Sequence, residues 1–376
     1  MMGRMSEYPR RTDPRRVIIA LVVVVGIIVA AFAFITWPRP KMYVYTYDSL
    51  LMWGNDSENI DNMVFGPFEQ QYGVDVEIVR LNTDANGIVS RLVAEAENPR
   101  ADVVIGIDNI LILQDQARQV LEPFTPSNLD LVNTTLVELL DEEHYIVPFD
   151  FGIVTLIYST DAMNVTTHPQ LANLTFEDLA EPSMASTLVT ENPHLSSPGL
   201  AFFLSEIAVY HGILDDDWRE WWCSVRDYID VQEGWSEAWA KWDSDPTRNM
   251  MVSYGTDPAY SAHYTGTAPD TAVALFSYNA ESYAWLQIEG IGLVKNGPNP
   301  DLAKKFIEYC LTEAVQSHIA LNQWMFPANL NVELPDVFDY AVHPDEVSPL
   351  NALLPATLIK SNLTSWLQEY DLIMTA

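Results

Sequence analysis

Large aromatic side chains stand where the chain is expected to turn or to begin a helix. Trp235 follows Gly234 at the start of a helical pattern, Tyr254 precedes a Gly, and Tyr260 ends the turn "GTDPAY". Trp324 lies in the loop "NQWMFP". The faces of such rings stack on flat heteroaromatic groups and attract cations. These rings are therefore candidate contacts for a flat, positively charged ligand, with core packing as the alternative.

Carboxylates follow two expected strands. Tyr47 and Asp48 end the alternating run "KMYVYTYD", and Asp108 ends the apolar run "ADVVIGID". Because parallel strands of one sheet end at a common edge, Tyr47, Asp48 and Asp108 are expected to face the same crevice. There the ring can stack and the acids can balance a positive charge. The alternative is that each Asp only caps the following helix.

The turn "LSSPG" precedes a long apolar helical pattern. Ser196, Ser197 and Gly199 supply hydroxyl and backbone N–H groups at the expected helix start, which is a site that favours anions such as phosphate. An ordinary capping turn, with Pro198 near the first helical position, explains the same residues. The local sequence leaves both interpretations open.

Nothing in the sequence indicates catalysis or a metal site. No Gly-x-Ser-x-Gly motif or phosphate loop is present, and no Cys-x-x-Cys or His-Glu-x-x-His spacing occurs. The chain has 52 acidic and 19 basic residues, a net charge of −33, which argues against binding to nucleic acid. We therefore expect a binding protein with no catalytic residue, metal or cofactor.

The order of the expected elements predicts an α/β protein with two lobes. Strands and helices alternate from residue 41 to residue 108, which predicts a lobe with a parallel sheet. The run "HYIVPFDFGIVTLIYS" leaves this lobe, but its Pro148 and Gly152 argue against one central strand. A second block follows, and "YAWLQIEGIGLVK" leads back. We expect lobe 1 at 41–148 with 275–340, lobe 2 at 149–274, and a helical tail at 341–376.

Ligands of such hinged architectures bind between the lobes. Trp235, Trp239 and Trp242 have helical spacing, so not all of them need to face the ligand. We expect Trp235, Tyr254 and Tyr260 to line the cleft, and Trp239 and Trp242 to pack inside lobe 2.

The N-terminus predicts a membrane segment. Residues 17–37 form an uncharged apolar run that is long enough to span a bilayer, and five Arg residues lie within residues 1–16. We expect a cytoplasmic N-terminus, a single transmembrane anchor and an extracellular or periplasmic binding domain. A cleaved signal peptide is the alternative. Cys223 and Cys310 are expected either to pair or to remain two separate thiols.

Taken in order, the motifs resemble a known family. The series "VYTYDS", "ADVVIGIDN", "VPFDFG", "SSPGL", "GWSEAW", "SYGTDPAY", "LQIE" and "WMFP" spans about Met42 to Pro335. It is similar to the thiamine-binding periplasmic proteins of thiamine ABC importers, in the type II substrate-binding protein superfamily. The resemblance implies a type II two-lobe fold, capture of thiamine or its mono- or diphosphate ester, and delivery to a permease and its ATPase by a monomeric protein.

The same resemblance implies roles for the matching residues. Rings of the ligand would be contacted by Tyr47, Trp235, Tyr254, Tyr260 and Trp324. Asp48 and Asp108 match acids near its charged and amino groups. Ser196, Ser197 and Gly199 match the turn at its hydroxyethyl or phosphate end.

Some residues depart from the family pattern. Asp257 stands where Ser often precedes Pro, and Phe151 replaces a more usual Tyr. One alternative keeps the fold with another cation, such as a polyamine. Another is a thiamine-related enzyme with a Cys nucleophile, which the expected mid-helix positions of Cys223 and Cys310 disfavour.

Overall fold

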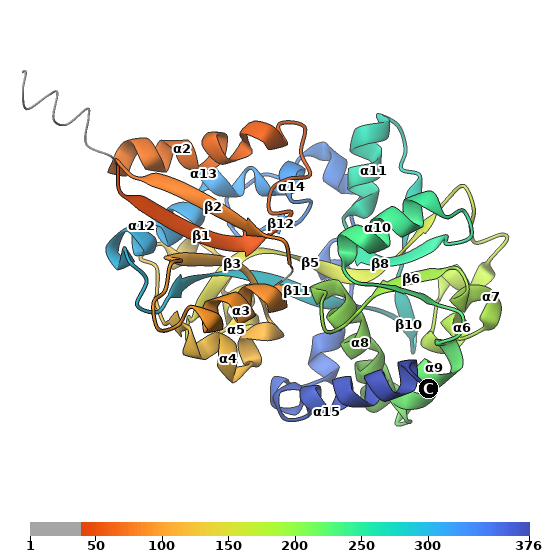
Figure 1. Cartoon of the computed structure of the whole chain (residues 1–376). Helices are drawn as coiled ribbons and strands as arrows, with labels where there is room; N and C mark the ends of the chain where they lie inside the picture. Colours follow the sequence, from red (N-terminus) through yellow and green to blue (C-terminus); the bar gives the residue numbers. More distant parts are fainter. Residues whose placement is uncertain (1–38, 84) are drawn as a thin grey trace, which may run out of the picture.

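The computed structural model describes residues 39–83 and 85–376, which form two lobes side by side (Figure 1). The expected cytoplasmic segment at 1–16 and transmembrane segment at 17–37 lie outside the described residues. The strands are β1 (Lys41–Tyr47), β2 (Asp75–Leu81), β3 (Val103–Asp108), β4 (Leu121–Glu122), β5 (Ile146–Ser159), β6 (Leu188–Glu191), β7 (Asp230–Gln232), β8 (Met250–Tyr254), β9 (Thr271–Ala274), β10 (Phe276–Tyr278), β11 (Glu281–Val294), β12 (Phe326–Pro327) and β13 (Ser348–Pro349). The helices are α2 (Ile60–Tyr72), α3 (Ala85–Ala94), α4 (Asp115–Gln119), α5 (Thr134–Leu140), α6 (Phe176–Leu179), α7 (Pro182–Ala185), α8 (Ser197–Val209), α9 (Trp218–Val225), α10 (Trp235–Ser244), α11 (Asp257–Thr265), α12 (Pro300–Cys310), α13 (Glu313–Gln316), α14 (Ile319–Asn322) and α15 (Ala356–Met374).

The first lobe has the predicted alternation of strands and helices. β1 lies between β2 and β3, and both pairs are parallel. Gly73 ends α2 with a left-handed backbone (φ 63°), which a residue without a Cβ adopts easily. All six residues of β3 are buried, as expected of a central parallel strand. The carboxyl ends of β1 and β3 therefore reach the same edge of the sheet.

Two 14-residue strands, β5 and β11, cross between the lobes and pair antiparallel with each other. The prediction that Pro148 and Gly152 interrupt the outgoing strand was wrong, because β5 is continuous. The ladder tolerates Pro148 because the register shifts between Glu289 and Gly290, next to its partner position. One sheet thus runs through both lobes in the order β2-β1-β3-β11-β5-β8-β6-β7.

The second lobe is built around β8, β6, β7 and the long helix α8. β6 is parallel to both β8 and β7. Every residue of α8 is buried, which explains why it is apolar on all sides. In the described part of the chain, the stretch Ser197–Leu214 alone is long and apolar enough to cross a membrane, and 78% of it is buried inside the protein. It is therefore the core helix of this lobe.

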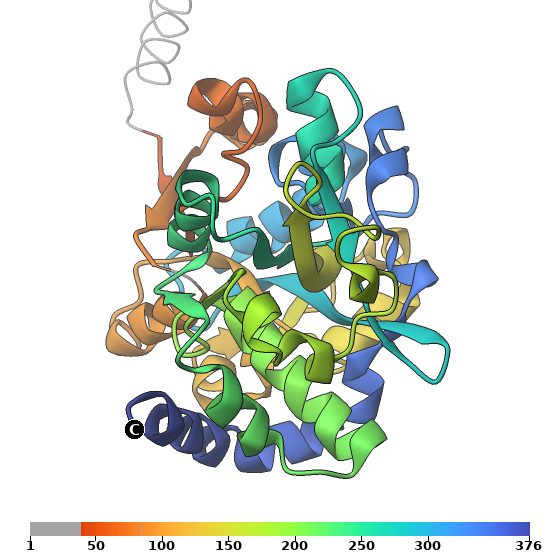
Figure 2. The same ribbon diagram turned by 90° about the vertical axis from the view of Figure 1, so that its right-hand side faces the viewer.

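Each lobe has its own apolar core. The core of the first lobe gathers residues from Met42 to Phe149 and from Ile288 to Ala328. The larger part of the second core comes from Val154 to Trp285, and α15 closes it from outside by packing against α9 (Figures 1 and 2). The two cysteines do not pair: Cys223 is exposed on α9 and Cys310 is buried in α12.

Candidate ligand-binding site

A cavity of about 360 Å³ lies between the lobes. The first lobe contributes the segments after β1, before α3 and after α14, and the second lobe contributes the turn before α8 and the starts of α10 and α11. The lining residues are Tyr47, Asp48, Ser49, Trp53, Asn82, Thr83, Ala85, Gly106, Leu195, Ser196, Ser197, Pro198, Glu233, Gly234, Trp235, Ser236, Glu237, Trp239, Tyr254, Asp257, Tyr260, Glu289, Gln323, Trp324 and Met325. Eight of the ten predicted site residues are among them; Asp108 and Gly199 are not.

Aromatic rings from both lobes form one wall of this cavity. Trp53 of the first lobe meets Trp235 of the second edge-on, with 5.1 Å between ring centroids. Tyr260 and Trp324 meet in the same way at 5.3 Å. The indole N–H of Trp235 donates to Ser253 Oγ (2.9 Å), which fixes the ring at the start of α10. Stacking surfaces are therefore held in place before any ligand enters.

The expected division of the three helical Trp residues needs one correction. Trp235 lines the cavity and Trp242 packs against buried Ile157, Val189 and Met251 of lobe 2, as predicted. Trp239 does both, because it lies one helical turn beyond Trp235 and its ring also faces Tyr260 at 5.6 Å.

A buried carboxyl group on the returning strand β11 forms the floor of the site. The hydroxyl of Tyr47 donates to Glu289 Oε2 (2.8 Å), and Gln287 Nε2 donates to Glu289 Oε1 (3.1 Å). Gln287 also donates to the hydroxyl of Tyr254 (3.1 Å), and Gln323 donates to that of Tyr47 (2.6 Å). Burial raises the pKa of Glu289 to about 7, and the Tyr47 hydrogen bond opposes that rise.

Asp150 lies opposite Glu289 in the β5–β11 ladder. Its side chain is fully buried and neither of its oxygens has a hydrogen-bond partner among the described residues. Burial, and then the nearby charge of Glu289, hold the pKa of Asp150 well above its usual range. The hinge therefore contains two carboxyl groups that do not both ionise easily.

Asp108 performs the capping role that was the alternative interpretation. Its Oδ1 accepts the backbone N–H groups of Ile110 (2.9 Å) and Leu111 (2.8 Å), and the residue is 1% exposed. Asp108 does not line the cavity, in contrast to the expectation that it faces the crevice. Burial raises its pKa, and an interaction with Ser197, which does line the cavity, opposes the rise.

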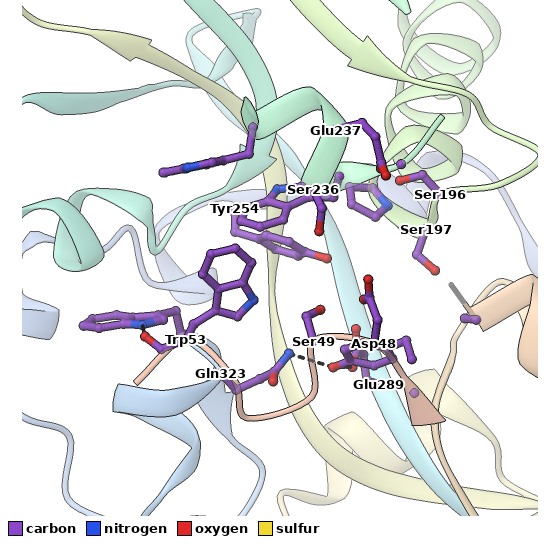
Figure 3. A pocket seen from close by; sticks show the side chains of 18 of the residues that line it. Asp48, Ser49, Trp53, Ser196, Ser197, Ser236, Glu237, Tyr254, Glu289 and Gln323 are labelled. Carbon is purple, nitrogen blue, oxygen red and sulfur yellow. Dashed lines mark hydrogen bonds between the residues drawn. The ribbon is translucent and has the colours of Figure 1, made fainter. Parts of the chain in front are cut away.

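In the "LSSPG" turn, the two serines line the cavity and the glycine does not. Ser196 caps α8 and accepts the N–H of Gly199 at 3.3 Å. A Cβ at position 199 would lie 2.6 Å from the carbonyl oxygen of Glu191 in β6. Gly199 is therefore required for close packing of α8 on the sheet, and Ser196 and Ser197 line the cavity (Figure 3).

Sequence reasoning missed several lining residues. Glu289 was inside the quoted motif "LQIE", and its signal was an acid in the middle of a buried strand. Asp257 was noted only as a departure from a pattern; burial raises its pKa to about 7, and its Oδ2 has no hydrogen-bond partner among the described residues. Trp53, Glu237 and Gln323 gave no local signal, because the packing of segments far apart in the sequence brings them to one cavity.

Comparisons with known proteins agree with this architecture. The model of the family described as bacterial extracellular solute-binding protein matches residues 64–344. A thiamine-binding periplasmic protein of Brucella abortus is 29% identical over 93% of this chain and 96% of its own length. The protein of that name from Escherichia coli is 30% identical over 81% of this chain and 86% of its own. A solved periplasmic thiamin binding protein superposes with a TM-score of 0.75 and 26% identity, covering 90% of this chain and 97% of the other.

Proposed function

Because this chain belongs to the family of bacterial extracellular solute-binding proteins, we propose that it captures thiamine or a closely similar cation between its lobes and delivers it to an ABC importer. The resemblance to thiamine-binding periplasmic proteins is confirmed, and so is the type II two-lobe fold. The chain is a solute-binding protein of an ABC transporter and not an enzyme.

One observation carries the choice of ligand: rings from both lobes and a buried carboxyl group line a single cavity. Trp53, Trp235 and Tyr260 offer faces and edges to a flat group, and Glu289 lies on the floor below them. A thiazolium ring is flat, aromatic and cationic, so it gains from stacking, from cation–π attraction and from the carboxylate together. Each stacked ring contributes about 1 kcal/mol beyond the burial of its area.

The site residues divide into roles on this proposal. Tyr47, Trp235, Tyr254, Tyr260 and Trp324 form the aromatic surroundings of the ligand, to which the structure adds Trp53. Glu289 and Asp257 balance the positive charge, and Asp48 accepts hydrogen bonds from polar edges of the ligand. Asp108 acts indirectly, because it orders the turn after β3 and adjoins Ser197.

The proposal includes a place in the cell. Residues 17–37, outside the described part of the chain, would anchor the domain in the membrane, with the lobes on the extracellular side where the family acts. A membrane anchor would keep a monomeric receptor close to its permease and the associated ATPase. Comparing the mass of the protein purified from membranes with that of the full chain distinguishes this anchor from a cleaved signal peptide.

Calorimetry of the full chain in detergent micelles tests the ligand. We expect thiamine to bind in the micromolar range or more tightly, with a change in tryptophan fluorescence, because Trp53 and Trp235 lie in the cavity. Spermidine is the competitor, since a cleft selective for polyamines would prefer it. Absence of heat and of a fluorescence change at millimolar thiamine would exclude thiamine as the ligand.

A further inference from the structure

Resting on the proposed membrane anchor, we propose that one end of the first lobe lies against the anionic headgroups of the lipid bilayer. This end, which we call the lysine pole, is where β1 and β3 begin and β11 ends. The cavity lies near the opposite ends of β1 and β3, at Tyr47 and Gly106. Contact with lipid at the lysine pole therefore leaves the cleft open to the ligand.

Basic side chains are scarce in this protein, and they gather at the lysine pole. Five of the 19 Lys and Arg residues lie within residues 1–16, which leaves 14 in the described part of the chain. Four of the six Lys residues in the sequence lie at the pole, together with two Arg residues. The six basic residues of the lysine pole are Arg39, Lys41, Arg100, Lys295, Lys304 and Lys305.

Hydrogen bonds hold these segments together although they are far apart in the sequence. Asn299 Nδ2 donates to the carbonyl oxygen of Lys41 (3.0 Å), and α12, which carries two of the lysines, begins directly after Asn299. The last residue of β11 donates its N–H to the carbonyl oxygen of Asp102 (3.0 Å), which brings Lys295 and Arg100 to the same end. Figure 1 shows α12 next to the start of β1, at the end of the first lobe that is farther from the second lobe.

Three of these bases have no acidic partner, which is unexpected in so acidic a protein. Among the described residues, no carboxylate forms an ion pair with Arg100, Lys295 or Lys305, whereas each of the other 11 described Lys and Arg residues forms at least one. Every base without an ion pair in the described part of the chain thus lies at the lysine pole. These three charges are available to an anion from outside the protein.

The acids at the pole leave it close to neutral. Those in the same segments are Asp75, Glu77, Glu97, Asp102, Glu122 and Asp301, as many as the bases. Elsewhere in the described chain, acids outnumber bases several-fold. The ion pairs of Arg39, Lys41 and Lys304 are exposed, and exposed pairs are weak, so headgroups can compete for these bases. An anionic membrane therefore repels the rest of the protein surface more than it repels the lysine pole.

Aromatic rings lie under the unpaired bases. The guanidinium of Arg100 lies 5.7 Å from the ring centroid of Tyr43, and the amine of Lys305 lies 5.1 Å from that of Tyr72. Both tyrosines are half-buried. Tyr is enriched where proteins meet the membrane–water interface, and Lys and Arg extend their charges to the headgroups there. The composition of the lysine pole is therefore that of an interfacial surface.

The short connection to the proposed anchor brings this pole to the membrane. The apolar run ends at residue 37 and β1 begins at Lys41, and four residues span at most about 14 Å. The field of the headgroups is screened beyond a Debye length, about 8 Å at physiological salt. Charges near the start of β1 are therefore the ones that the headgroups attract. With the first lobe held in this way, closure of the cleft moves the second lobe.

Lysine footprinting of the full chain in nanodiscs tests this contact. The discs contain phosphatidylcholine alone or with phosphatidylglycerol, and mass spectrometry of peptides follows the reaction of each lysine with an amine-reactive reagent. We expect Lys295 and Lys305 to react at least about threefold more slowly in the anionic discs, because basic side chains are attracted to anionic lipid. High salt should restore their rates. Lys241 on α10 and Lys360 on α15 are internal controls and should react equally in both discs.

Removing two of the unpaired charges tests their role. The double variant Arg100→Gln, Lys305→Gln should lose most of the protection of Lys295 in anionic discs. It should bind thiamine as the unmodified protein does, because neither residue lines the cavity. The matched control is Arg219→Gln with Lys360→Gln, two exposed bases that belong to α9 and α15, and it should leave the protection of Lys295 unchanged.

The outcomes separate this inference from the proposed function. Equal reaction of Lys295 and Lys305 in both kinds of disc, with the chain inserted, would overturn the lipid contact and leave thiamine capture intact. Protection that arises only after the permease is added would also overturn it, and would assign the pole to a protein partner. If the full chain does not insert into the discs, the proposed anchor is wrong, and the lipid contact with it.

Discussion

Trp235 is the residue at which the aromatic hypothesis is most directly testable. Its ring meets Trp53 across the cleft and is oriented by the hydrogen bond to Ser253. We expect Trp235→Ala to weaken thiamine binding about tenfold, since a stacked ring and its cation–π attraction contribute about 1 kcal/mol or more. Trp242→Ala is the control on the same helix, because Trp242 packs inside lobe 2 and does not line the cavity. Equal losses in calorimetric affinity would indicate that both act only by stabilising α10.

Asp257 gives the site a pH dependence whose sign is defined. Burial raises its pKa to about 7, so the carboxyl is mostly neutral at pH 6 and mostly charged at pH 8. A bound cation favours the charged form, and thiamine should therefore bind more tightly at pH 8 than at pH 6 and release protons on binding. Asp257→Asn should reduce both effects. Calorimetry in buffers of different ionisation enthalpy measures the released protons. An affinity for thiamine that does not depend on pH in the unmodified protein would contradict a role of Asp257 in binding the cation.

The same raised pKa governs stability in the opposite direction. The folded ligand-free protein holds a proton on Asp257 that the unfolded chain has lost at neutral pH. The contribution of Asp257 to the free energy of unfolding is therefore fully present below about pH 4 and is lost as the pH rises through about 7. Buried Glu289, with a pKa of about 7, acts with the same sign. Each group adds a slope of up to about 1.4 kcal/mol per pH unit between its unfolded and folded pKa values. Melting temperatures should fall over this range, and Asp257→Asn should flatten the curve.

At the scale of single residues, the sequence predicted a residue that lines the cavity where that residue stands at the expected end of a strand or start of a helix. Tyr47 and Asp48 end a strand, Ser196 caps a helix, and Trp235 starts one. Glu289 could not be identified in this way, because a residue inside a buried strand is expected to pack. Its role depends on the crossing of β5 and β11, which brings it under the cavity.

At the scale of elements, the contact between α8 and β6 positions the serine turn. Gly199 allows it, since an added Cβ would come within 2.6 Å of a backbone oxygen that cannot move aside as a flexible side chain would. We expect Gly199→Ala to lower the free energy of unfolding by about 1–3 kcal/mol and to weaken ligand binding by shifting Ser196 and Ser197. Chemical denaturation and calorimetry on the same samples measure the two effects.

Gly66→Ala is the matched control for that substitution. Gly66 is also buried in a helix, but its added Cβ meets only the side chain of Asn62, whose Oδ1 lies at 3.0 Å. Alanine favours helix more than glycine does, whereas Pro67 disfavours a Cβ on the residue before it, so this variant should change the free energy of unfolding by at most about 1 kcal/mol. A loss as large as that of Gly199→Ala would show that any added methyl group is harmful, and not the approach to β6.

The crossing strand β5 shows why element-level prediction failed at one point. Pro and Gly within a β-rich run normally indicate a break, and Pro148 lies beside a register shift as this rule implies. The strand continues because Phe149 and its neighbours are buried in the core of the first lobe and pair with β11, so tertiary pairing overrides the local preference. The alternating residue pattern predicted a strand here, but it did not predict that the strand is uninterrupted.

At the scale of the whole molecule, the two lobes touch at the rim of the cleft as well as at the hinge. Tyr264 on α11 donates its hydroxyl to the carbonyl oxygen of Trp53 (2.7 Å) in the other lobe. On the opposite side, Asn86 Nδ2 donates to the carbonyl oxygen of His194 (3.1 Å). These bonds join the two lobes, so opening the cleft would break them, and they favour the closed state over the open state without contacting the ligand.

Tyr264→Phe removes one rim hydrogen bond worth about 0.5–1.5 kcal/mol, and it should weaken thiamine binding about two- to tenfold. The loss should appear mainly as faster dissociation in stopped-flow fluorescence, because the bond holds the closed state. In small-angle scattering, the ligand-free variant should be more extended than the unmodified protein. Tyr340→Phe, another exposed tyrosine that does not line the cavity, is the control and should change neither quantity. If Tyr264→Phe leaves the dissociation rate unchanged, contacts within the cavity govern closure, and the hydrogen bond at the rim does not stabilise the closed state.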